Sequence, residues 1–169
     1  SSSNKMPLLV DRPLHSFATI GGTAAITTAG NYNTPSPSGC FLLVDCSSND
    51  GAVIDSLSIL TLENSSATHN VLVFLSTATT ATSITAANTA LVARAAVTST
   101  LGSRANISLP PLSVPVPNLG ADSNISETDK KNTGLYVPSS ALIYVGIDEA
   151  MDAPSANTRV HVFAQGGFF

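Results

Sequence analysis

The chain has 169 residues, only 11% of them charged, and a formal net charge of −4 at pH 7. This length suits one domain, no apolar run reaches the roughly 18 residues that span a bilayer, and the absence of a basic block argues against nucleic-acid binding. Soluble domains average about 25% charged residues. A surface this poor in charge suits a protein whose faces are covered by neighbours, although a Ser/Thr-rich β protein would have the same composition.

The first 14 residues are expected to form an extended arm, because Pro7 and Pro13 interrupt regular structure. Arms of this kind pack on neighbouring subunits in assemblies, whereas in other proteins they are frayed tails. We expect the arm to contact a partner through its apolar residues, which are Met6, Leu8, Leu9 and Val10. Residues 15–169 are expected to form a single β-sandwich domain.

Short runs rich in β-branched and aromatic residues follow the arm, separated by Gly, Pro, Asn and Ser turns. The expected strands cover 15–20, 23–28, 40–46, 55–63, 70–76, 91–99, 105–109, 141–148 and 158–164. Eight or nine short strands with such turns predict an all-β fold, a β-sandwich or jelly roll.

The only two cysteines bracket one of these strands, in "CFLLVDC" at 40–46. In a straight strand Cys40 and Cys46 share a face with Leu42 and Val44, and their Cα atoms lie about 20 Å apart. A disulfide needs roughly 4.4–6.8 Å, so we expect two buried, free thiols that do not bond to each other. A bond at a sharp bend and a metal site are the alternatives. Free cysteines indicate folding in a reducing compartment.

Two expected strands, 70–76 and 141–148, are apolar on both faces. A two-layer sandwich buries one face of each sheet, so the second apolar face predicts a subunit interface or a covering loop. The last strand differs, because Arg159 and His161 alternate with Val160 and Val162, as in an outer strand.

A long connection without strand character runs through 109–134 and begins with a proline-rich stretch. Irregular connections of this length are usually functional or lie on a partner. We expect residues 110–119 to be extended and to contact another chain through four apolar side chains, those of Leu112, Val114, Val116 and Leu119.

Signals for catalysis or for a bound cofactor are weak. His15, His69 and His161 are scattered singly, and no nucleophile motif accompanies them. The acidic turn with Asp148, Glu149 and Asp152 could hold calcium, but it lacks the spacing of a known loop and is expected to be solvated. We therefore expect no catalytic residue, no metal and no cofactor, and a protein that is not an enzyme.

The chain from about residue 57 onward resembles the small jelly-roll virion proteins of tailed bacteriophages, including the capsid decoration (cement) proteins of cyanophages. Three segments carry the resemblance, namely Leu62 to Asn64, Leu135 to Pro138 and Val160 to Gly166. The resemblance implies a structural protein that binds the outer surface of a capsid across subunit seams. It also implies the major capsid protein as partner, a homo-oligomer, expected to be a trimer, and assembly in a bacterial cytoplasm.

A second reading is a tail-associated or receptor-binding β-sandwich that contacts host surface glycans. Such a protein should carry exposed aromatic residues in its loops, and the candidates are Tyr32, Tyr136, Phe168 and Phe169. The number of copies in the virion separates the two readings, because a shell protein is present in hundreds of copies and a tail protein in a handful.

Overall fold

The computed structural model describes residues 12–21, 39–62, 64, 69–98, 100–110, 134–148 and 159–169. Within these ranges the chain is all-β, with one short 3-10 helix at Ala81–Ser83. The strands are β1 (Arg12–Gly21), β2 (Phe41–Asp45), β3 (Gly51–Thr61), β4 (His69–Ser76), β5 (Thr89–Val97), β6 (Arg104–Ile107), β7 (Leu135–Pro138), β8 (Leu142–Ile147) and β9 (Arg159–Phe168).

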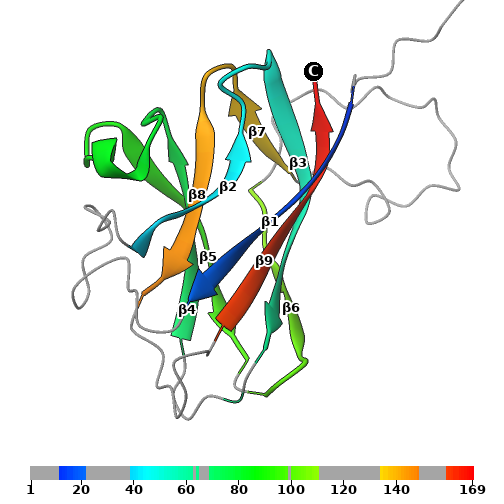
Figure 1. Cartoon of the computed structure of the whole chain (residues 1–169). Helices are drawn as coiled ribbons and strands as arrows, with labels where there is room; N and C mark the ends of the chain where they lie inside the picture. The colour runs from blue at the N-terminus through cyan, green and yellow to red at the C-terminus, as the bar shows by residue number, and fades with distance from the viewer. Residues whose placement is uncertain are drawn as a thin grey trace, which may run out of the picture.

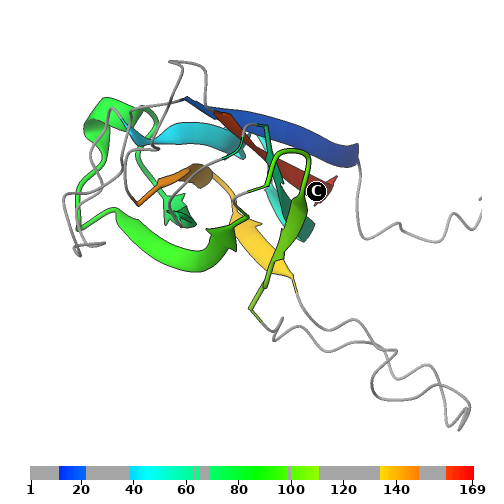
Figure 2. The same ribbon diagram turned by 90° about the horizontal axis from the view of Figure 1, so that it is seen from below.

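The strands form two antiparallel sheets (Figure 1). A five-stranded sheet has the order β1-β9-β3-β6, with β7 also paired to β3, and a four-stranded sheet has the order β2-β8-β4-β5. The blue strand β1 and the green strand β5 lie on opposite sides of the molecule in Figure 2.

This strand order is that of a jelly roll. β1 pairs with β9, β2 with β8, β3 with β6 and β4 with β5, all antiparallel. The chain is therefore a long antiparallel ribbon, folded so that successive strand pairs alternate between the two sheets. The expected all-β sandwich is confirmed.

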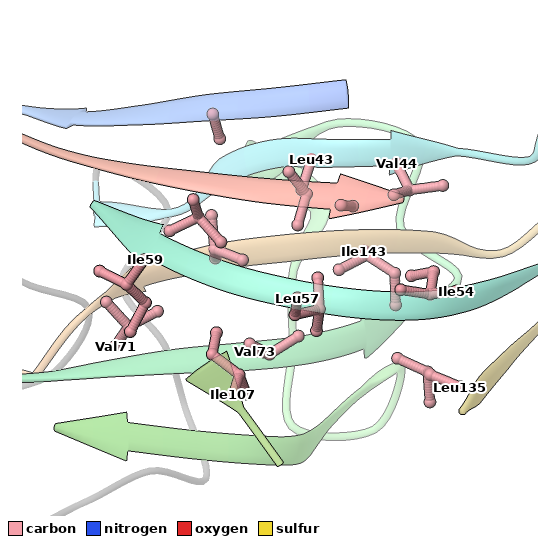
Figure 3. Packing of buried hydrophobic residues seen from close by; sticks show 14 of the residues in the cluster. Leu43, Val44, Ile54, Leu57, Ile59, Val71, Val73, Ile107, Leu135 and Ile143 are labelled. Carbon is pink, nitrogen blue, oxygen red and sulfur yellow. The ribbon is translucent and has the colours of Figure 1, made fainter. Parts of the chain in front are cut away.

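The core between the sheets consists of aliphatic side chains that alternate along the strands. Ile54, Leu57 and Ile59 of β3 face Val71 and Val73 of β4, and all are at most 1% exposed (Figure 3). Side chains of a strand point alternately to its two faces, and the bulge between Ile54 and Ser56 reverses this alternation in β3, so that both Ile54 and Leu57 enter the core.

The expectation that the two cysteines share a face is wrong, although both are free and buried as expected. A β-bulge between Leu42 and Val44 inserts one residue into β2 relative to β8. Such an insertion reverses the side-chain alternation beyond it. Cys46 consequently faces the main core, whereas Cys40 lies on the outer face of the four-stranded sheet.

A second apolar cluster explains the strands that are apolar on both faces. Phe74, Leu142 and Tyr144 point away from the main core and pack against Ala78 and Ile84 of the connection between β4 and β5. This connection is the green excursion beside β8 in Figure 1. Of the two explanations predicted for the second apolar face, the covering loop is confirmed.

Hydrogen bonds hold the covering connection in place. The Tyr144 hydroxyl donates to the carbonyl of Ala78 at 2.8 Å, and the amide of Ala78 donates to the hydroxyl of Ser76 at 3.0 Å. Both backbone polar groups of the buried Ala78 therefore have partners, as buried backbone groups require.

Ionisation of buried groups predicts a loss of stability at alkaline pH. Burial raises the pKa of Cys40 from 9.0 to about 11. Burial, followed by the Asp45 charge, also raises the pKa values of Cys46 and Tyr144. As the pH rises, these groups lose their protons in the unfolded chain before they do so in the folded chain. The free energy of unfolding is therefore undiminished below about pH 9 and falls as the pH rises through about 11. Urea unfolding across this window measures the fall, and Cys40→Ala should make it shallower; a constant unfolding free energy would contradict it.

Most expected strands are confirmed with shifted ends, and three expectations need correction. The arm expected over residues 1–14 ends earlier, because Arg12–Leu14 belong to β1. β7, Leu135–Pro138, is not among the expected strands. The last strand was expected to be an outer strand, but β9 lies between β1 and β3 and is an inner strand. Its residues alternate because one face of the sheet points outward. The expected strand 23–28 lies outside the described residues.

Candidate binding face

The expected partner-binding residues lie outside the residues that the structure describes. They are Met6, Leu8, Leu9, Val10, Leu112, Val114, Val116 and Leu119. The described chain shows only where their segments begin and end. Arg12 begins β1 opposite Phe168, and the amide of Gly134 donates to the carbonyl of Pro110 at 3.1 Å, so the two ends of the 111–133 segment are adjacent.

The outer face of the five-stranded sheet carries the most distinctive group of side chains in the described part of the chain. Strand pairing arranges them in three rows that run across β1, β9, β3 and, for two rows, β6. The rows are His15–Gln165–Ser56, Phe17–Phe163–Ser58–Asn106 and Thr19–His161–Leu60–Arg104. We call these eleven side chains the outer rows.

Three aromatic rings from β1 and β9 form the centre of the outer rows. The ring centroids of Phe17 lie 5.9 Å from His161 and 6.2 Å from Phe163, and His161 meets Phe163 edge-on at 5.8 Å. Centroid distances of 4.5–7 Å are favourable for aromatic pairs. Phe17 is nevertheless 61% exposed, so this cluster presents an apolar surface to the outside.

Arg104 supplies the permanent positive charge of the outer rows. Its guanidinium carbon lies 5.5 Å from the centroid of Phe163, a cation–π distance, and it donates to the hydroxyl of Ser58 at 3.3 Å. None of the eleven side chains is acidic. The outer rows therefore carry a positive charge, although the acidic Asp55, which the bulge in β3 places next to Ser56, is exposed beside them.

A shallow hollow of about 350 Å³ lies beside the aromatic cluster. Its lining is polar except for one ring and consists of His15, Ser56, Ser58, Arg104, Asn106, Phe163 and Gln165. The bulge between Ile54 and Ser56 bends β3 here, and Ser56 pairs with Gln165. The hollow thus has a rigid floor of four paired strands.

The three histidines have different environments. His15 and His161, which are far apart in the sequence, both lie on the outer rows, His15 in the row of Gln165 and His161 in the row of Thr19. His69 begins β4 and is only 2% exposed, and neither ring nitrogen has a hydrogen-bond partner in the described part of the chain. The alternation in 15–20 and 158–164 was the signal that could have placed Phe17 and Phe163 on the outward faces of their strands. Only strand pairing places them together.

The acidic turn considered for calcium has a structural contact at its first residue. The Asp148 carboxylate accepts hydrogen bonds from the Asn70 backbone amide at 2.9 Å and from the Asn70 side-chain amide at 2.8 Å. These bonds link β8 to the start of β4. Glu149 and Asp152 lie outside the described residues, and among those described no group of three or more potential metal ligands is found.

Comparisons of the chain with protein families, with curated proteins and with solved structures find no match. In the described ranges no helix has the length and apolar character that crossing a membrane requires. Interpretation of the chain consequently rests on the fold and on the outer rows.

Proposed function

We propose that this protein is a structural virion protein of a tailed bacteriophage. In this proposal it decorates the outer surface of the capsid, binds the major capsid protein as a trimer of its own chain, and stabilises the shell across subunit seams. It is assembled in the bacterial cytoplasm, where Cys40 and Cys46 stay reduced, and it has no enzymatic activity.

The jelly-roll strand order is the observation that carries the proposal. Jelly rolls recur in viral capsid proteins, but the fold alone does not decide function. The resemblance adds support, because two of its segments pair with β3 and the third follows β3 at its other end. Leu135–Pro138 forms β7, Val160–Gly166 lies in β9, both pair with β3, and Leu62 directly follows β3.

The two segments proposed to hold the shell start from opposite edges of one sheet. Arg12 is on the β1 edge, while Pro110 and Gly134 are beside β6 and β7. Both starting points lie in the half of the sheet that contains Gly51, because Arg12 pairs with Phe168, Phe168 with Ala52, and Leu135 with Ile54. A shell contact at this end leaves the outer rows open.

Deletion and substitution of these segments test the proposal. Removing residues 1–11 keeps β1 intact, and Val114→Ser with Val116→Ser removes two apolar contacts. Each buried apolar side chain contributes roughly 1.5–3 kcal/mol, so both variants should bind undecorated phage heads at least about tenfold more weakly. Attachment that is mainly apolar should resist moderate salt.

Leu101→Ser is the matched control, because Leu101 is 56% exposed in the turn after β5, at the opposite end of β3. It should bind heads as tightly as the unmodified chain. Folded variants of both segments that saturate heads with unchanged affinity would refute the attachment. Quantitative mass spectrometry of virions tests the location, since only a handful of copies would contradict a shell protein.

A further inference from the structure

The hollow on the outer rows presents hydrogen-bonding side chains that have no partner among the residues that the structure describes. In the described part of the chain no hydrogen bond is formed by the side chains of His15, Asn106 and Gln165. Each amide offers both donors and a carbonyl acceptor. These groups project from paired strands, which hold them more firmly than loops do.

The charge of the hollow selects for an anionic group. Arg104 is held by Phe163 and Ser58 and is the permanent cation of the outer rows, which contain no carboxylate. A guanidinium has five N–H donors in a planar fork, and a carboxylate can accept two of them together. The contact to Ser58 uses one nitrogen and leaves further N–H donors for a ligand.

From these observations we propose that the hollow binds a saccharide that carries a carboxylate, such as a uronic acid residue of a polysaccharide. Arg104 binds the carboxylate, Asn106 and Gln165 bind ring hydroxyls, and the exposed ring of Phe17 packs against the C–H face of a neighbouring sugar. This site is a second binding activity. It does not depend on the shell contact, which uses another part of the molecule.

A saccharide fits the site better than a protein surface does. The volume, about 350 Å³, lies at the lower end of the range of small-molecule pockets, roughly 300–1,000 Å³. Its lining combines a few fixed polar groups with one aromatic ring. The centre of a protein interface is instead mostly apolar. The hollow therefore matches a ligand with many hydroxyl groups and one charge.

Calorimetric titration of the full chain with trigalacturonate tests this assignment. We expect saturable binding, and at least about tenfold weaker binding of maltotriose, which has the same number of rings and no carboxylate. Arg104→Gln should weaken trigalacturonate binding by a similar factor. Asn106→Ala should weaken the binding of both sugars, because it removes contacts to hydroxyl groups.

Arg94→Gln is the matched control, since Arg94 is exposed on β5 of the opposite sheet and its replacement removes the same charge. It should leave the affinity unchanged. Absence of saturable trigalacturonate binding would overturn the proposal, as would equal weakening by Arg94→Gln. Equal or tighter binding of a triglutamate peptide would also overturn it and would indicate a site for an acidic protein. Circular dichroism of each variant establishes that it is folded.

Discussion

Replacing Gly166 by alanine is expected to destabilise the domain by on the order of 3 kcal/mol or more. A Cβ atom at this position would lie 1.9 Å from the carbonyl oxygen of Val53 and 3.0 Å from the Cα atom of Ile54. Both are backbone atoms of β3, the strand at the centre of the five-stranded sheet. Neither can move aside as a flexible side chain could. Urea unfolding of Gly166→Ala measures the loss.

Gly102→Ala separates this collision from ordinary glycine strain. Gly102 has a φ of +80°, but a Cβ there meets nothing within 4 Å. Its replacement should cost about 1 kcal/mol, the usual strain of a side chain in the left-handed region. An equal or smaller stability loss in Gly166→Ala than in Gly102→Ala would contradict the close approach of the β3 backbone to Gly166.

Phe74→Ala is expected to cost about 3–5 kcal/mol, because it removes the largest fully buried side chain among the described residues and leaves a cavity. Phe74 is 1% exposed and lies in the second cluster with Cys40, not in the main core. The loss should loosen the covering connection between β4 and β5. Thiol labelling of the folded variant should then modify Cys40 faster than Cys46, which lies in the main core.

Phe17→Ala is the matched control for this prediction, since it removes the same side chain at a position that is 61% exposed. Because this variant loses only the ring contacts of Phe17 with His161 and Phe163, its effect on stability should be about 1 kcal/mol, well below that of Phe74→Ala. Equal labelling rates of Cys40 and Cys46 in Phe74→Ala would contradict the assignment of the two thiols to separate clusters. A similar stability loss in both variants would contradict the burial of Phe74 beneath the connection between β4 and β5.

The sequence by itself determined the fold class and most of the strands. The aliphatic runs at 70–76 and 141–148 and the turn residues between strands are local signals, and they depend on neighbouring residues alone. The alternation in 158–164 likewise indicated one buried and one outward face. The apolar second faces of 70–76 and 141–148 also indicated that something covers them. The sequence did not determine which segment this is.

The tertiary structure decided everything that depends on pairing between distant strands. The bulge at Leu42–Val44 reversed the expected face of Cys40 relative to Cys46, because one inserted residue shifts a period of two. β7 forms only because β3 extends past β6 and offers it a partner. Phe17, Phe163 and Arg104 meet because antiparallel register aligns β1, β9, β3 and β6. Register is a property of two strands at once, and no single stretch of the chain contains it.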